Sequence, residues 1–317
     1  INLNIYSKQQ YYLEVVKKAF ETAKIQYIVL KGWAMIDMYP HPECRQAADV
    51  DIYIGAHQRE KAMSVMKELG FEGEYSSDYG HHDEYHIGKM VHIELHHVMI
   101  KNVYPWTEEC NRLPERAVAV SGVEYEFTKE NYYFFMIAHI AKHLKANGIG
   151  IKSITDVYVY LNKAGADMSE KVLADTLAAG RLTDFDKVLR ELIGVWFYDG
   201  EHTEGSRVLE HFLFMSGWMG SKKQQDSTKV ANAVHTEDGT SKIRMYAANI
   251  FPSFEYMKEK YSVLTKLPVL LPVYYIVRIF RIVIFKRKSL ERFNNIVQNG
   301  DVDEGRRLNS MRQKFGL

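Results

Sequence analysis

Cysteine is scarce in this sequence, and its scarcity excludes two classes of protein. Cys44 and Cys110 are the only cysteines among 317 residues, and they lack the spacing of a zinc knuckle. A disulfide framework of the kind that stabilises small secreted domains is therefore excluded. The first residues show no signal-peptide pattern, so we expect a reducing, cytoplasmic compartment.

An excess of charge of one sign is also missing. The chain has 41 Lys and Arg against 40 Asp and Glu, a formal net charge of +1. Such a balance argues against bulk electrostatic attraction to nucleic acid as the main activity, so no strong nucleic-acid partner is indicated. Apolar residues make up 46% of the chain. This is enough for one large core or two modest ones.

Long apolar runs are absent as well. The one candidate segment, residues 267–288, reads LPVLLPVYYIVRIFRIVIFKRK, and prolines and arginines interrupt it. We therefore expect no transmembrane segment. A buried helix whose arginines reach the surface is the favoured interpretation. An interfacial helix on anionic lipid stays open, because the chain from Arg278 onward has ten Lys and Arg against four Asp and Glu.

Helical and strand-like segments alternate over residues 1–127, which predicts a sheet domain of the α/β or α+β class. Helices are expected at 11–23, 31–39 and 58–69, strands at 27–30, 49–54, 71–76, 84–88 and 91–97, and a hairpin at 117–127.

After Thr128 the strand signals stop, and an all-α domain is expected over residues 128–317. Thr128 is the predicted N-cap of a long helix, and Asp167 is the predicted N-cap of a later one. Residues 219–240 are polar and rich in Gly and Ser, which predicts a loop. The helical domain would close the cleft of the first domain.

Two aspartates occupy one predicted strand. In residues 49–54, the apolar side chains of Val50, Ile52 and Ile54 share one face, whereas Asp49 and Asp51 share the other. Two neighbouring carboxylates repel each other unless a cation lies between them. Mg²⁺ suits this role because it takes oxygen ligands and completes its shell with phosphates. The pair alone is weak evidence, because such pairs also occur on solvated surfaces.

Three further features strengthen the interpretation. Lys31 and Gly32 follow a predicted strand and open a helix, where backbone N–H groups bind anions, although an ordinary turn would look the same. Arg45 could hold a triphosphate or form a surface ion pair. Glu94 and His96 lie on the polar face of an alternating strand, so Glu94 can supply a third carboxylate.

The order of these parts resembles the polymerase-β-type nucleotidyltransferase superfamily. LKGWAM and RQAADVDI are closest to the branch with a Lys-Gly turn, which includes uncharacterised bacterial nucleotidyltransferases and, more distantly, abortive-infection toxins. The resemblance implies an α+β fold with a mixed sheet flanked by helices. It implies that the metal ligands and catalytic carboxylates are Asp49, Asp51 and Glu94, with Glu94 as the candidate base toward the acceptor hydroxyl. It implies that the nucleotide contacts come from Lys31, Gly32, Trp33 and Arg45. Trp33 stands where the family usually has a small residue.

A group of polar residues in the helical half is also a candidate. His139, Lys142 and His143 lie within one helix and Asp156 in the next. The histidine pair could bind a metal, the group could contact the nucleobase or the acceptor, or these residues could line a helix–helix seam. His96 joins them as a possible acceptor or base contact. The spacing of the histidines in the sheet region matches no metal template, so a solvated sheet face with one or two pocket residues is expected there.

The predicted reaction is transfer of a nucleoside monophosphate from an NTP to a hydroxyl group, with release of pyrophosphate. One or two Mg²⁺ ions and an NTP, with ATP expected, are the implied cofactors. The acceptor is unknown and ranges from small molecules to macromolecules. Two alternatives stay open: a non-catalytic nucleotide-binding protein that keeps the fold, and a membrane-surface protein that uses residues 267–288.

Overall fold

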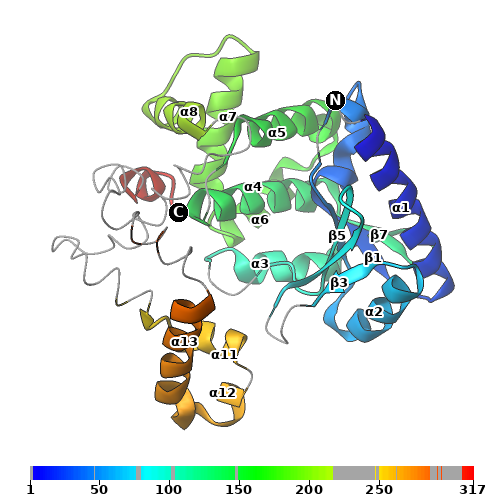
Figure 1. Cartoon of the computed structure of the whole chain (residues 1–317). Helices are drawn as coiled ribbons and strands as arrows, with labels where there is room; N and C mark the ends of the chain where they lie inside the picture. Colours follow the sequence, from blue (N-terminus) through cyan, green and yellow to red (C-terminus); the bar gives the residue numbers. More distant parts are fainter. Residues whose placement is uncertain are drawn as a thin grey trace. The chain divides into compact units, whose positions relative to one another are not determined.

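The chain divides into two compact units, described by a computed structural model. The structure describes residues 3–45, 47–75, 80–100, 104–146, 149–216, 247, 250–261, 263–285, 291, 294 and 309–317 (Figure 1). The first unit consists of residues 1–76, 80–140 and 153–186, and the second of residues 77–79, 141–152 and 187–317. The expected loop at 219–240 lies outside the described residues. The expected domain boundary after residue 127 stays a prediction.

A seven-stranded mixed sheet organises the first unit, in the order β3-β4-β5-β2-β1-β7-β6. Its strands are β1 (Tyr27–Val29), β2 (Val50–Tyr53), β3 (Glu72–Glu74), β4 (His82–Ile87), β5 (Val91–His96), β6 (Val118–Ser121) and β7 (Glu124–Glu126). The pairs β2–β5 and β1–β7 are parallel, and the other neighbours are antiparallel. The expected α+β class with a mixed sheet is confirmed.

The other described elements are helices. The sheet region has α1 (Leu3–Thr22), α2 (Arg59–Glu68), α3 (Thr107–Arg112) and the 3-10 helices η1 (Lys31–Met38), η2 (Pro42–Cys44), η3 (Ala56–Gln58) and η4 (Leu113–Arg116). Later come α4 (Lys129–Ala146), α5 (Ile151–Ala164), η5 (Gly165–Asp167), α6 (Glu170–Ala179), α7 (Thr183–Phe197), α8 (Glu204–Ser216), α11 (Phe254–Lys260), α12 (Val263–Lys266), η6 (Pro268–Leu270) and α13 (Leu271–Phe285). After residue 128, the described residues form no strand.

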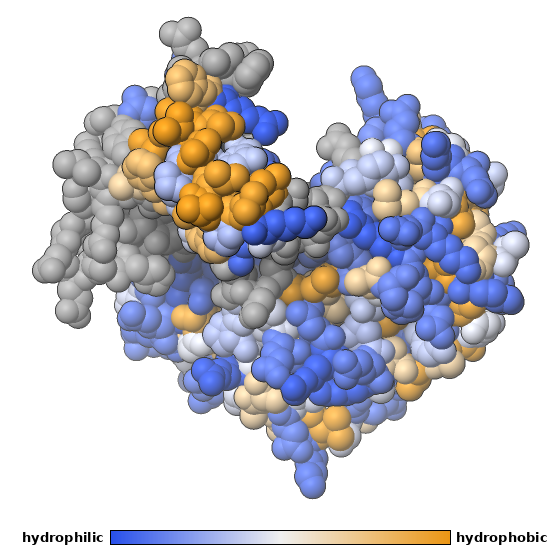
Figure 2. All heavy atoms as spheres, turned by 90° about the horizontal axis from the view of Figure 1, so that it is seen from below, coloured by the Kyte–Doolittle hydropathy of each residue, from blue (hydrophilic) through white to orange (hydrophobic). Residues whose placement is uncertain are grey.

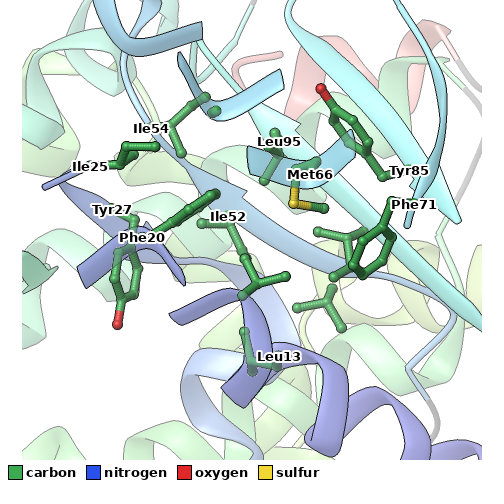
Figure 3. Packing of buried hydrophobic residues seen from close by; sticks show 14 of the residues in the cluster. Leu13, Phe20, Ile25, Tyr27, Ile52, Ile54, Met66, Phe71, Tyr85 and Leu95 are labelled. Atoms are coloured by element: carbon green, nitrogen blue, oxygen red, sulfur yellow. The ribbon is translucent and has the colours of Figure 1, made fainter. Parts of the chain in front are cut away.

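The core of the first unit lies between one face of the sheet and helices α1 and α2. Leu13 and Phe20 of α1 and Met66 of α2 pack against Ile52 and Leu95 of the strands (Figure 3). All five side chains are buried. Because strand side chains alternate, burying this face turns the polar residues of β2 and β5 to the opposite face.

Two local expectations needed correction. Ser169 caps α6, with its hydroxyl oxygen accepting from the Val172 N–H, whereas the Asp167 carboxylate accepts from Lys129 Nζ at 2.5 Å. An N-cap requires extended backbone at one position, and that position is Ser169. The segment after Leu30 forms the eight-residue 3-10 helix η1, which is an unusual length for this helix type.

Helix α13 is not the buried helix that was the favoured interpretation of residues 267–288. Val273, Ile276, Val277 and Phe280 are exposed, at a spacing that places them on one side of the helix (Figure 2). Of the described helices, α11 lies beside α13 (Figure 1). Among the described residues, no helix is both long and apolar enough to cross a membrane.

The buried sheet face predicts a large effect of a single truncation in β2. Replacing Ile52, which is fully buried, by Ala removes apolar contacts and leaves a cavity. We expect the free energy of unfolding to fall by about 2–5 kcal/mol. Urea unfolding measures this, with Val118→Ala on the exposed strand β6 as a control that shifts stability by less than about 0.5 kcal/mol. Equal losses in the two variants would contradict the position of the core.

Candidate functional site

Two carboxylates face each other across the parallel strands β2 and β5. The register pairs Asp51 directly with Glu94, and their side chains lie on the face opposite the core. Asp51 is 2% exposed, whereas Glu94 is partly exposed. Directly opposed like charges destabilise a sheet. The arrangement therefore requires a positive charge between them.

Lys31 provides that charge in this structure. Its Nζ donates a short hydrogen bond to Asp51 Oδ1 and lies 3.6 Å from Glu94 Oε2. The ammonium group stands where a metal cation would bind the same oxygens. Antiparallel pairing places the end of β1 beside the start of β2, and the Leu30 N–H donates to the Asp51 carbonyl at 2.8 Å. This backbone contact brings Lys31 to the carboxylates.

Lys31 is held in an uncommon conformation. Its φ is +49°, in the left-handed region that residues with a side chain rarely adopt. The Tyr132 hydroxyl of α4 donates a short hydrogen bond to the Lys31 carbonyl oxygen and so holds this turn from the other side. Strained backbone of this kind concentrates at functional sites. Tyr132 was not a candidate from the sequence, because only the folded chain brings it to Lys31.

His96 is the third group at the carboxylates. Its Nε2 lies 2.8 Å from Asp51 Oδ1 and 3.2 Å from Glu94 Oε2. One donor atom each of Asp51, Glu94 and His96 fall within 4.8 Å of one another, a spacing that one metal ion can bridge. The sequence suggested His96 as an acceptor or base contact, and that role stays a prediction; the geometry places its ring nitrogen beside both carboxylates.

The charges in this group shift one another's pKa. Burial alone would raise the pKa of Asp51, but the Lys31 charge and the hydrogen bond to His96 hold it below its usual range. Burial likewise opposes ionisation of Glu94, but His96 and Lys31 outweigh it and lower its pKa. The Lys31 pKa is raised: although burial lowers it, the charges of Asp51 and Glu94 more than compensate. Both carboxylates are therefore ionised near neutral pH, as metal ligands must be.

Asp49 lies next to this group without being part of the close set. β2 begins at Val50, so Asp49 precedes the strand instead of standing within it. It is partly buried, and its charge contributes to the raised pKa of Lys31. Its role as a metal ligand stays a prediction.

Gly32 and Arg45 form a second part of the site, one residue beyond Lys31. The Arg45 guanidinium donates from Nε to Asp156 Oδ1 at 2.9 Å and from Nη2 to Asp156 Oδ2 at 2.8 Å. The Tyr39 hydroxyl also donates to Asp156 Oδ1, at 2.5 Å. Asp156 of α5 therefore holds the arginine in place. The sequence suggested Asp156 as a contact of the acceptor, and the structure shows it in contact with Arg45.

The guanidinium lies directly over Gly32. A Cβ atom at this position would stand 1.8 Å from Arg45 Nη1, so only glycine leaves room for the arginine. Arg45 is buried, and its Nη1 has no hydrogen-bond partner among the described residues. A buried donor without a partner costs about 1–3 kcal/mol, and an anion at Gly32 would satisfy it. The groups fit the phosphates of a nucleotide.

The Trp33 indole points away from this turn into the core. The ring is buried and stacks on Tyr6 with centroids 5.7 Å apart and an angle of 6° between the planes. The side chain therefore belongs to the core cluster between the sheet and α1. Only its backbone is left for contact with a ligand at Gly32.

The remaining candidates belong to α4. His139 lies in the first unit, with its ring 6.0 Å from that of Phe135. Lys142 and His143 lie in the second unit and are partly buried. The described contacts join none of the three to the carboxylates, and their role stays a prediction.

A cleft of about 500 Å³ opens on the same face of the sheet as the carboxylates. Ile28, Tyr53 and Tyr125 line it from three neighbouring strands, and Glu115 of η4 lines it from outside the sheet. The register places Tyr53 directly opposite His96 and two residues beyond Asp51. The cleft therefore lies toward the start of β1, at the end of this strand opposite to Lys31, and neither Asp51 nor Glu94 lines it.

Comparisons with known proteins add three findings. The profile of a family described as uncharacterised nucleotidyltransferase matches residues 4–197. The solution structure of the antibiotic-resistance factor ANT(2'')-Ia is similar with a TM-score of 0.41 and 16% identity, over 57% of this chain and 97% of that one. The crystal structure of ANT(2")-Ia in complex with adenylyl-2"-tobramycin is similar with a TM-score of 0.40 and 16% identity, over 55% of this chain and 97% of that one. No curated protein matches the sequence.

The contact between Gly32 and Arg45 predicts that the smallest side chain is already too large at this turn. In Gly32→Ala the methyl group displaces the guanidinium and breaks its paired hydrogen bonds to Asp156. We expect the free energy of unfolding to fall by about 2 kcal/mol, measured by urea unfolding. Gly194→Ala, in α7 with no atom within 4 Å of the new Cβ, is the matched control and should be neutral or stabilising. Similar stability of both variants would contradict the packing described.

Proposed function

The chain belongs to the family of uncharacterised nucleotidyltransferases, and we propose that it transfers a nucleoside monophosphate from an NTP, with ATP as the expected donor, to an acceptor hydroxyl. One observation carries the proposal: Asp51 and Glu94 stand opposite each other with a cation between them, next to a glycine turn with an unpaired arginine donor. Metal-binding oxygens and phosphate-binding nitrogens are thus adjacent. Nucleotidyl transfer needs both.

The carboxylate oxygens of Asp51 and Glu94 are suitable ligands for a divalent metal ion. Asp51 and Glu94 would hold Mg²⁺, with Asp49 as the predicted further ligand, and the lowered pKa values keep the two paired carboxylates ionised. When bound there, Mg²⁺ would neutralise phosphate charge and lower the pKa of the acceptor hydroxyl. Lys31, Gly32 and the Nη1 donor of Arg45 would bind the triphosphate.

The proposed reaction is an in-line displacement. The acceptor oxygen attacks the α-phosphorus, the bond from that phosphorus to the bridging oxygen breaks, and pyrophosphate leaves. Glu94 is the predicted base for the hydroxyl proton. Its lowered pKa makes it a weak base and suits it better to binding metal.

The acceptor is proposed to approach from the Tyr53 side. Lys31 and Gly32 follow the end of β1, whereas the cleft lined by Ile28 and Tyr53 lies toward the start of β1. In-line attack places the nucleophile opposite the leaving group. With the triphosphate at Lys31, the cleft lies on the side from which a hydroxyl must arrive. The class of acceptor stays open.

Substitution of the carboxylates tests the reaction. Asp51→Asn and Glu94→Gln retain shape but remove the charge that binds metal. We expect each to slow transfer by about 10³-fold or more, because such electrostatic contacts contribute several kcal/mol to lowering the barrier. The assay follows pyrophosphate release and transfer of labelled AMP from ATP to an acceptor pool from cell extract.

The matched control is Glu72→Gln, which changes an exposed carboxylate on β3, at the edge of the same sheet. It should leave the rate within about twofold, since it touches neither proposed ligand. An Asp51→Asn variant as active as the wild type would refute the metal role. Calorimetric binding of Mg²⁺-ATP without turnover by the wild type with any acceptor pool would instead favour a non-catalytic nucleotide-binding protein.

A second activity is favoured by α13 alone. Its exposed apolar side chains at 273, 276, 277 and 280 and the basic excess that begins at Arg278 suit an interfacial helix on anionic lipid. We therefore propose that this segment attaches the protein to membrane surfaces. The attachment does not depend on nucleotidyl transfer.

Sedimentation of the full chain with vesicles tests this attachment. We expect binding to anionic but not neutral vesicles, weakened more than about tenfold in Ile276→Ser/Phe280→Ser, because two apolar side chains no longer enter the lipid. The control Val118→Ser/Val120→Ser removes two exposed apolar side chains from β6 and should bind as the wild type does. No binding to anionic vesicles, or equal loss in both variants, would refute the proposal.

A further inference from the structure

Three histidines meet at one place on the sheet, beside the carboxylates. His82 at the start of β4 lies directly opposite His96 at the end of β5, and His81 precedes His82. The ring centroids are 4.2 Å apart for His81 and His82, 5.1 Å for His82 and His96, and 5.7 Å for His81 and His96. One nitrogen of each ring falls within 4.8 Å of the other two.

The backbone holds this group in place. The His97 N–H donates to the His81 carbonyl at 3.0 Å, and the Val98 N–H shares the same acceptor at 3.3 Å. His81 is therefore tied to the end of β5 even though it precedes β4. The group does not depend on a flexible side chain reaching across a gap, and its three rings come from two paired segments of backbone.

Two ring nitrogens in the group have no partner. His96 is 3% exposed, its Nε2 contacts the carboxylates, and its Nδ1 is buried without a hydrogen bond among the described residues. The Nδ1 of His82 is in the same condition. A buried ring nitrogen without a hydrogen-bond partner costs free energy. A cation that binds the lone pair of that nitrogen removes the cost.

The donor atoms determine which cation fits. Imidazole nitrogens favour zinc and related transition metals, whereas Mg²⁺ prefers oxygen ligands. Three histidines with one open position form a zinc arrangement that leaves room for water or substrate. The neighbouring group of Asp51 and Glu94 has the opposite preference. His96 belongs to both groups, so the sheet face presents an oxygen-rich site and a nitrogen-rich site side by side.

We propose that His81, His82 and His96 form a binding site for a divalent transition metal of the zinc type, separate from the Mg²⁺ site at Asp51 and Glu94. The site does not require the chain to transfer nucleotides, so it can be tested even if the proposed reaction is wrong. It goes beyond the sequence-based expectation of a solvated sheet face with one or two pocket residues.

The direct experiment is titration with Zn²⁺ of the full chain, stripped of bound transition metals and kept in saturating Mg²⁺. We expect one equivalent of Zn²⁺ to bind by calorimetry, and Co²⁺ in its place to give visible absorption bands of nitrogen coordination. His81→Asn/His82→Asn should weaken Zn²⁺ binding by more than about 100-fold. Replacing a residue that only hydrogen-bonds to a metal ligand lowers metal affinity by about 10–100-fold, and this variant removes two ligands themselves. Because the Co²⁺ bands are recorded on the wild type, the test holds even if this variant is unstable.

Two further variants complete the design. His86→Asn/His92→Asn removes two stacked histidines that lie opposite each other on the same two strands but belong to neither group, and should bind Zn²⁺ as the wild type does. Asp51→Asn/Glu94→Gln should retain the Zn²⁺ while losing Mg²⁺-ATP binding. Absence of Co²⁺ bands, displacement of Zn²⁺ by Mg²⁺, or loss of Zn²⁺ only in the carboxylate variant would overturn the proposal.

Discussion

The parallel pairing of β2 with β5 is the constraint on which the site depends, because it sets Asp51 directly opposite Glu94. The other face of the same strands is occupied by the core, so the carboxylates cannot turn away without exposing Ile52 and Leu95. Their mutual repulsion has to be met by a cation. In this structure Lys31 provides the cation. The backbone hydrogen bond from the Leu30 N–H to the Asp51 carbonyl places the next residue, Lys31, beside the carboxylates.

The turn at Lys31 and Gly32 connects the carboxylates to the Arg45 guanidinium. Lys31 faces carboxylates, whereas Gly32, the next residue, is covered by the guanidinium of Arg45, which Asp156 holds. Tyr132 fixes the carbonyl between them. A displacement of this turn therefore changes the cation environment of the carboxylates and the position of the arginine together. Metal and phosphate would meet one rigid piece of backbone rather than two independent loops.

Period-two alternation was sufficient to predict the strands and the polar side of each, because these features are local, whereas the mixed sheet and the meeting of Asp51 with Glu94 were expected from the family resemblance. Non-local pairing decided what alternation could not show. His82 meets His96 only because β4 is the antiparallel neighbour of β5, and Asp156 reaches Arg45 across 111 residues of chain. Asp167 carried the signal of an N-cap but pairs with Lys129, a residue no local pattern identifies. The apolar composition of α13 indicated burial, whereas exposure depends on which elements pack against it.

The raised pKa of Lys31 and the proposed metal site follow from the same electrostatics. Asp51 Oδ1 already accepts from Lys31 and contacts His96, so a divalent cation at this oxygen has to take over part of the neutralisation that the ammonium now provides. An ammonium relieved of that contact is a cation one residue away from Gly32 and the unpaired donor of Arg45. Under the proposed function, one lysine therefore compensates the carboxylates without metal and the phosphates with it. That exchange gives a physical reason for a partly buried lysine at a site whose proposed metal ligands are negatively charged.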